Sequence, residues 1–176
     1  MNLDPRDVLV MAVAGVGALT DLRSRRIPNA LTASGMASAV VVGVATDGWV
    51  GLMHAIGGLA TGFALLGGPF AVRIVGAGDV KFLMALGAFI GPRSTVEAFI
   101  WATAAGGLLA LAMLGVSPRA RTRVLTSWIQ FKNLVYTRDV SVLKPETPGD
   151  TIAVPYGLAL ALGAVIAQLG RGLLLG

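Results

Sequence analysis

The sequence predicts an all-α polytopic membrane protein: a bundle of about six transmembrane helices with an amphipathic helix at the cytoplasmic membrane surface. Three observations predict this fold. Of the 176 residues, 55% are hydrophobic and only 13% are charged, about half the charged fraction of a soluble domain, and the mean hydropathy is +0.78. The 24 glycines favour close packing between transmembrane helices. The apolar residues also fall into separate segments of helical length, with turns or charged loops between them.

The predicted helices cover residues 8–20, 30–45, 50–70, 80–91, 95–116 and 152–175. The first helix reaches the ~20 residues of a full span only if it extends over residues 3–22. Acidic residues outweigh Arg6 before it, so we expect a retained helix and not a cleaved signal peptide. In the third helix, the Gly58-xxx-Gly62 spacing predicts a face for close helix packing. We expect residues 1–176 to form a single membrane-embedded domain.

Short turn sequences separate these helices. Pro28 ends any continuing helix, and Asn29 is a plausible N-cap for the next one. Thr46-Asp47-Gly48 and Gly91-Pro92-Arg93-Ser94 are also turns. The polar loop, residues 117–151, contains apolar residues at spacings that indicate a helix lying on the membrane surface. These residues are Val124, Trp128, Phe131 and Val135.

The composition excludes several kinds of site. The chain has no cysteine, which excludes disulfides, thiolate metal sites and cysteine nucleophiles. The net charge of +5 does not indicate a nucleic-acid partner, because the basic residues flank apolar segments and form no separate patch. We expect no metal ion and no cofactor.

The distribution of lysine and arginine predicts the orientation. With six spans and the N-terminus outside, only Arg6, Arg93 and Arg171 of the 14 basic residues lie outside. This is a strong positive-inside bias. The same topology places Asp21 and Asp79 on the cytoplasmic side of the membrane, at similar depth.

Asp21 and Asp79 stand out because each lies at the edge of an apolar segment, where a charge is costly. Gly76 and Gly78 precede Asp79 and let the backbone approach closely. Two carboxylates brought together share one proton near neutral pH. The charged member then takes a proton from water while the protonated member polarises a peptide carbonyl. We therefore interpret the two residues as the catalytic pair of a membrane-embedded aspartic protease.

Three motifs carry a resemblance to a known family: Thr20-Asp21-Leu22-Arg23-Ser24-Arg25-Arg26-Ile27-Pro28-Asn29, Gly76-Ala77-Gly78-Asp79-Val80-Lys81 and Pro155-Tyr156-Gly157. In this order and at these spacings, over essentially the whole chain, they resemble the type IV prepilin peptidases, which are GxGD aspartic proteases. The resemblance implies that Asp21 and Asp79 are catalytic. It also implies a set of substrate-binding or site-supporting residues, namely Gly76, Gly78, Lys81, Arg26, Pro28, Asn29, Pro155, Tyr156 and Gly157.

The resemblance further implies a substrate and a location. The expected partners are prepilin or pilin-like proteins and the lipid bilayer. Cleavage removes a basic leader after a glycine, just before the substrate's hydrophobic helix, at the cytoplasmic face of a bacterial or archaeal inner membrane. Larger family members carry an extra N-terminal domain with paired CxxC zinc motifs and methylate the new N-terminus. This chain resembles the short form found in tight-adherence (Flp) pilus systems, and we expect no N-methyltransferase activity.

Two other functions compete with this interpretation. Another GxGD intramembrane protease, of the presenilin or signal-peptide-peptidase type, is expected to carry Pro-Ala-Leu where this chain has Pro155-Tyr156-Gly157. A small transporter or pilus-assembly scaffold with coupling carboxylates would hold them near the membrane midplane and not at its edge.

Simpler structural roles compete at single positions. A helix-end carboxylate neutralised by neighbouring arginines would explain Asp21, and helix capping would explain Asp79. Lys81 has the position of an interfacial lysine whose ammonium group reaches toward water. Capping at the outer ends of helices would explain Asp47 and Glu97.

Overall fold

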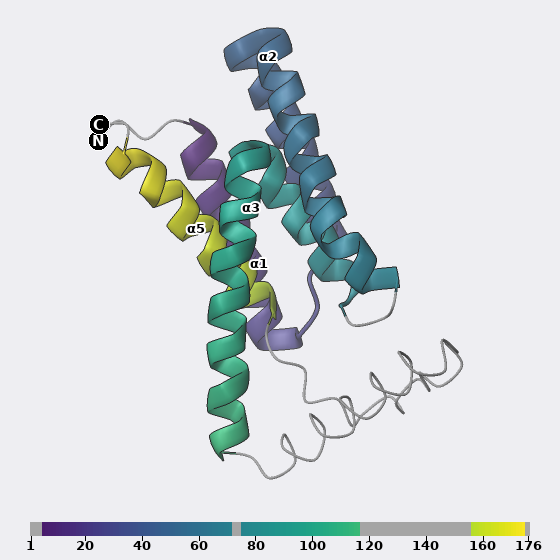
Figure 1. Ribbon diagram of the computed structural model, residues 1–176. Coiled ribbons are helices and arrows are strands. Elements are labelled where there is room, and N and C mark those ends of the chain that lie inside the picture. The colour runs from purple at the N-terminus through teal and green to yellow at the C-terminus, as the bar shows by residue number, and fades with distance from the viewer. Residues whose placement is uncertain (1–4, 72–74, 117–155, 175–176) are drawn as a thin grey trace. The chain divides into compact units, whose positions relative to one another are not determined.

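The computed structural model describes residues 5–71, 75–116 and 156–174 (Figure 1). Four helices account for nearly all of them: α1 (Pro5–Ser24), α2 (Asn29–Ala71), α3 (Ala77–Val116) and α5 (Tyr156–Leu174). No strand occurs within these ranges, so the all-α prediction is confirmed there. The predicted surface helix within residues 117–151 lies outside the described residues, as does Pro155.

The chain divides into two compact units, one comprising Met1–Gly106 with Pro155–Gly176 and the other Gly107–Val154. The first unit holds α1, α2, α5 and most of α3. Among the described residues, the second unit holds only the end of α3. The contacts discussed below all lie within the first unit, and the single peptidase domain over residues 1–176 stays a prediction.

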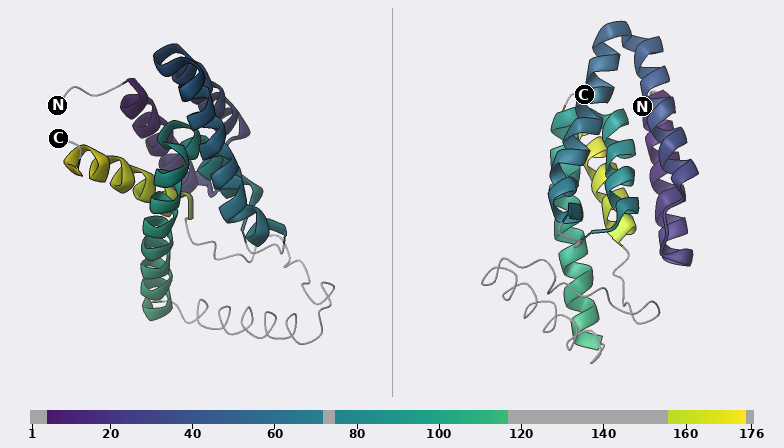
Figure 2. Two further views of the ribbon diagram at one scale, coloured as in Figure 1. Left: turned by 45° about the horizontal axis from the view of Figure 1, so that its top comes forward. Right: turned by 90° about the vertical axis from the view of Figure 1, so that its right-hand side faces the viewer.

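Both long helices are interrupted at a glycine with positive φ. Gly48 in α2 has φ 57° and ψ −128°, and Gly91 in α3 has φ 75° and ψ 175°. A residue with a Cβ atom is strained at these backbone angles. Glycine has none, so it permits each break. Gly43 and Gly51 lie in contact on either side of the first break, so the two halves of α2 run back along one another (Figure 2). The turns predicted from the sequence at these two places are confirmed.

Small residues set the contacts between the helices. Gly58 and Gly62 of α2 both face α3, where a Cβ would collide with the backbone of Gly87 and Met84. A Cβ at Gly163 of α5 would likewise collide with the α3 backbone. The backbones therefore approach closely without intervening side chains. This confirms the packing face predicted from the Gly58-xxx-Gly62 spacing.

Large apolar side chains lie on the outside of the protein as well as in its core. Phe82, Leu83 and Leu86 of α3 are fully buried, whereas Trp49 is 72% exposed and Ile100 is 60% exposed. Many large apolar side chains on the surface are unfavourable in water but suit a lipid environment. In length and composition, α2 and residues 77–112 of α3 are apolar enough to cross a membrane. These features support a membrane protein.

Candidate active site

Asp21 lies within the last turn of α1 and is only 6% exposed. The helix extends past the predicted apolar segment to Ser24 and ends at Arg25, which adopts φ 52° and donates its N–H to the Asp21 carbonyl at 2.8 Å. A left-handed residue at this place is a usual helix terminator. The arginines at positions 23, 25 and 26 are exposed while the Asp21 side chain is buried. Asp21 is therefore directed into the protein.

The first turn of α5 holds the Asp21 side chain. The backbone N–H of Leu158 donates to Asp21 Oδ2 at 3.2 Å. Gly157 packs on the same carboxylate, and a Cβ at Gly157 would stand 2.9 Å from Oδ2. The N-terminal turn of a helix favours a negative charge, because its N–H groups point outward and its dipole is positive there. Gly157 thus lies where the sequence predicted a supporting residue, and the amide of Leu158 adds a donor that the sequence did not indicate.

Asp79 is the third residue of α3 and is half-buried. The N–H groups of Asp79 and Val80 donate to the carbonyl of Gly76 at 3.2 and 3.4 Å. In return, the backbone N–H of Gly76 bonds to the Asp79 carboxylate. The Asp79 carboxylate thus reaches back to the residue before the helix, as the third helical residue of a capping box does, although Gly76 has no side chain to complete such a box. Asp79 is therefore not the N-cap that the simpler interpretation predicted, because it lies inside the first turn of α3, and its bond to Gly76 fixes the direction of its carboxylate.

The structure brings Asp21 and Asp79 into one site, where the two carboxylates interact electrostatically. The contact between their helices explains why. Gly17 precedes Asp21 by one turn of α1, and Phe82 follows Asp79 by about one turn of α3. The ring of Phe82 packs directly on Gly17, where an added Cβ would overlap it. Because α1 and α3 touch at this level, the ends that carry the aspartates meet.

Ile27 closes the site between the three helices. A Cβ at Gly78 would lie 3.8 Å from Ile27 Cβ, and a Cβ at Gly157 would lie 3.0 Å from Ile27 Cδ1. One side chain therefore contacts the glycine turn before Asp79 and the first turn of α5. This role of Ile27 was not predictable from the sequence, because an isoleucine in a basic loop gives no indication of which residues it contacts.

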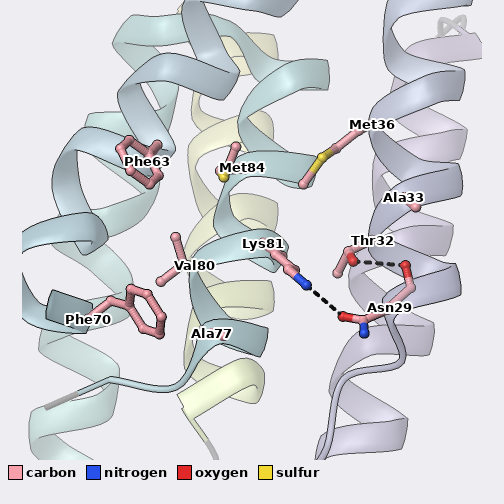
Figure 3. A pocket seen from close by; sticks show the side chains of 10 residues that line it. All are labelled: Asn29, Thr32, Ala33, Met36, Phe63, Phe70, Ala77, Val80, Lys81 and Met84. Carbon is pink, nitrogen blue, oxygen red and sulfur yellow. Dashed lines mark hydrogen bonds between the residues drawn. The ribbon is translucent and has the colours of Figure 1, made fainter. Parts of the chain in front are cut away.

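The other predicted site residues are spread around this centre. Arg26 and Pro28 are exposed in the loop between α1 and α2. Asn29 is the first residue of α2, one position inside the predicted N-cap position, and its Oδ1 accepts a hydrogen bond from Lys81 Nζ at 3.0 Å (Figure 3). The Lys81 ammonium group thus reaches toward α2. Tyr156 lies against α3, where its hydroxyl bonds to the side chain of an exposed threonine.

An apolar groove of about 550 Å³ opens beside the first turns of α3 (Figure 3). Its walls come from both halves of α2 and from α3. The lining residues are Asn29, Thr32, Ala33, Met36, Phe63, Phe70, Ala77, Val80, Lys81 and Met84. The sequence did not predict this groove, because its apolar residues look like those of any transmembrane segment. In the described part of the chain, no group of three or more histidine, aspartate or glutamate residues is placed to hold a metal ion.

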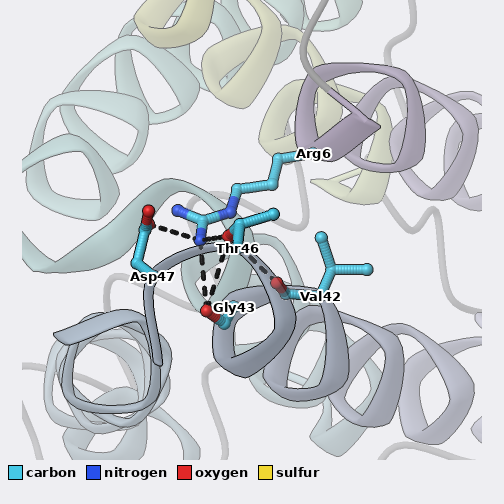
Figure 4. Close-up of polar contacts among 5 residues, drawn as sticks. All are labelled: Arg6, Val42, Gly43, Thr46 and Asp47. Atoms are coloured by element: carbon cyan, nitrogen blue, oxygen red, sulfur yellow. Dashed lines mark hydrogen bonds and ion pairs between the residues drawn. The ribbon is translucent and has the colours of Figure 1, made fainter. Parts of the chain in front are cut away.

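A second polar cluster lies at the opposite end of α1 (Figure 4). The Arg6 guanidinium donates to the Asp47 carboxylate at 2.6 Å, to the Gly43 carbonyl at 3.3 Å and to the Thr46 hydroxyl. Asp47 therefore pairs with a cation from another helix in addition to standing at a helix end. Glu97 similarly accepts a hydrogen bond, at 3.3 Å, from an arginine one turn earlier in α3. The Arg6 cluster joins α1 to the turn of α2 and is separate from the aspartate pair.

Comparisons with known proteins address the identity of the chain. No curated protein and no solved structure gives a match. A model of the type IV leader peptidase family matches residues 8–111, which is more than half of the chain. The matched range includes Asp21, Asp79 and the residues of the apolar groove, and it ends before α5. The chain belongs to the type IV leader peptidase family.

Proposed function

We propose that this peptidase is a membrane-embedded aspartic endopeptidase in which Asp21 and Asp79 form the catalytic pair. Its substrates are type IV or Flp prepilins, from which it removes the basic leader at the cytoplasmic face of the inner membrane. The observation that supports the proposal is that Asp21 and Asp79, which come from different helices, lie near enough for their carboxylates to interact electrostatically. Two acidic side chains held together in a partly buried site are costly, and such arrangements are concentrated at sites of catalysis.

In the proposed reaction, the pair holds one proton between its two carboxyl groups. The charged group takes a proton from a water molecule while the water oxygen attacks the carbonyl carbon of the scissile peptide. The protonated group gives its proton to the carbonyl oxygen, which yields a tetrahedral diol. When the C–N bond breaks, the group that took the water proton gives it to the leaving nitrogen, and one diol hydroxyl gives its proton to the other carboxylate, which restores the single shared proton. The products are a leader with a new carboxyl terminus and a mature protein with a new amino terminus.

Backbone groups position both carboxylates for this reaction. The N–H of Leu158 bonds to Oδ2 of Asp21, and the N–H of Gly76 bonds to the carboxylate of Asp79. Each donor is a backbone N–H at the N-terminal end of a helix, so the fold holds its direction and no side-chain rotation is needed. Such preorganised dipoles stabilise charge without reorganisation during the reaction. We assign Gly76, Gly157 and Leu158 as positioning residues on this basis.

The proposed membrane arrangement follows the breaks in α2 and α3. The two halves of each of these helices, together with α1 and α5, form the six spans, and the aspartate pair lies at their cytoplasmic end. Exposed apolar side chains on the described helices face lipid in this arrangement. The excess of basic residues predicted on the same side as the aspartates supports the orientation. We propose peptidase activity without N-methyltransferase activity.

A cleavage assay in detergent or membranes tests the proposal, using a prepilin with a basic leader as substrate. Asp21→Asn and Asp79→Asn keep the side-chain size, and each should lower kcat at least ~10³-fold while the protein still inserts, as losses of catalytic residues do. Asp47→Asn, in the Arg6 cluster, is the matched control and should cleave normally. A metal chelator should have no effect. Cleavage by a folded double Asn variant would rule out the aspartyl mechanism, and absence of cleavage by the wild type with several leaders would favour a transport or scaffold role.

A further inference from the structure

The apolar groove is built to accept an apolar chain. Met36 from the first half of α2 stands on one wall and Phe63 and Phe70 from the second half on the other, while Val80 and Met84 of α3 form the back (Figure 3). Methionine side chains are flexible and polarisable, so they adapt to apolar groups of different shape. A groove of about 550 Å³ has room for several side chains of a bound segment.

One end of the groove is polar. Among the described residues that line the groove, only Asn29, Thr32 and Lys81 have polar side chains, and Lys81 Nζ donates to Asn29 Oδ1 at 3.0 Å. A peptide that lies extended at the edge of a membrane needs partners for its backbone groups. The ammonium group of Lys81 has three donors, so it can bond to a peptide carbonyl as well as to Asn29. The groove therefore combines an apolar floor with a donor for a peptide backbone.

The groove also adjoins the aspartate pair along the chain. Ala77 and Val80 line it, and they stand on either side of Gly78 and Asp79 in the first turn of α3. One helical turn rises only about 5.4 Å, so a segment bound at Ala77 and Val80 is within a few residues of the carboxylates. Gly76 and Ala77 are both exposed at this turn.

We propose that the apolar groove binds the first apolar residues that follow the scissile bond of the substrate. This inference rests on the proposed function and adds the location of the substrate-recognition surface on this chain, which is formed by both halves of α2 and the start of α3.

A kinetic experiment tests the proposal by filling the groove. Ala33 is exposed and its side chain faces the groove, so Ala33→Phe adds a ring there without disturbing buried packing (Figure 3). With a leader-bearing prepilin as substrate, we expect KM to rise about tenfold or more with kcat nearly unchanged, because only binding is obstructed. Ala12→Phe places the same ring on an exposed position of α1 and should leave both constants unchanged. Equal constants for Ala33→Phe and wild type would overturn the proposal.

A cross-linking experiment locates the bound segment directly. Because the chain has no cysteine, a single introduced cysteine gives no background. In an Asp79→Asn protein, which retains uncleaved substrate, Phe63→Cys should form a cross-link to a cysteine placed just after the scissile bond. Ile100→Cys, on an exposed position of α3, should not.

The outcomes separate this inference from the function on which it rests. Cleavage by the wild type, with no cross-link from Phe63→Cys, would overturn the groove assignment and leave the aspartic mechanism standing. Persistent photolabelling of the groove by a phospholipid analogue, undiminished by excess prepilin, would identify it as a lipid site and also overturn the assignment. Absence of cleavage by the wild type would overturn both proposals.

Discussion

Leu158 donates its backbone N–H to Oδ2 of Asp21 at 3.2 Å, which joins the first turn of α5 to the last turn of α1. The contact links residues from opposite ends of the chain and uses a backbone group and not a side chain. The family match over residues 8–111 does not include α5. The direction of the Asp21 carboxylate nevertheless depends on α5, so a truncation before Tyr156 removes part of the proposed site.

The close packing of Gly157 on Asp21 predicts an effect of the smallest possible substitution. In Gly157→Ala, the added Cβ would stand 2.9 Å from Asp21 Oδ2 and 3.0 Å from Ile27 Cδ1, so the carboxylate must move. We expect kcat for leader cleavage to fall about 10²-fold, as for small displacements of catalytic groups, with insertion unchanged. Gly170→Ala in the same helix meets nothing within 4 Å and should cleave normally. Equal kcat values for the two variants would contradict a positioning role for this turn.

The contact between Gly17 and Phe82 predicts a loss of stability. A Cβ at Gly17 would overlap the buried Phe82 ring, so Gly17→Ala should lower the free energy of unfolding by about 1–3 kcal/mol, the usual cost of overpacking. Gly15→Ala, two residues earlier, meets nothing and should be neutral or slightly stabilising. Thermal unfolding in detergent measures both. Phe82→Leu should partly restore the Gly17→Ala protein, and failure of this rescue would argue against the steric explanation.

The two glycines with positive φ predict different costs for the same substitution. Gly48→Ala meets no neighbouring atom, so its cost is the backbone strain alone, about 1–3 kcal/mol. Gly91→Ala carries similar strain and in addition drives a Cβ into the His54 ring. The hydroxyl of Thr95 also bonds to the Gly91 carbonyl at 2.6 Å and resists movement there. We expect the midpoint of thermal unfolding to fall further for Gly91→Ala, and the reverse order would contradict this assignment.

The Arg6 cluster predicts a change of stability without a change of activity. Arg6 is 18% exposed and Asp47 50% exposed, so their ion pair is worth about 1 kcal/mol or less. Asp47→Asn should lower the unfolding temperature slightly and leave kcat and KM for leader cleavage unchanged. A loss of cleavage matching that of Asp79→Asn would show that the two ends of α1 are functionally coupled, contrary to this prediction.

Much of the secondary structure was predictable because it depends on local properties of the sequence. Apolar segments of the right length predicted the helices, and the sequences around Gly48 and Gly91 predicted the breaks. The ends of the helices were less predictable. The first helix continues beyond its apolar segment to Ser24, because an exposed Arg23 and a buried Asp21 are compatible with a final helical turn.

The sequence by itself determined the membrane-like composition, the order of the helices and the two aspartates at their edges, since charge in an apolar sequence is conspicuous. The tertiary structure decided how the site is assembled. Gly17 against Phe82, the Ile27 contacts and the amide of Leu158 bring the two carboxylates together and orient them. These contacts involve backbone groups and apolar side chains, which are chemically alike at every position in the chain. Their roles therefore depend on which helices touch, and only the folded structure specifies that.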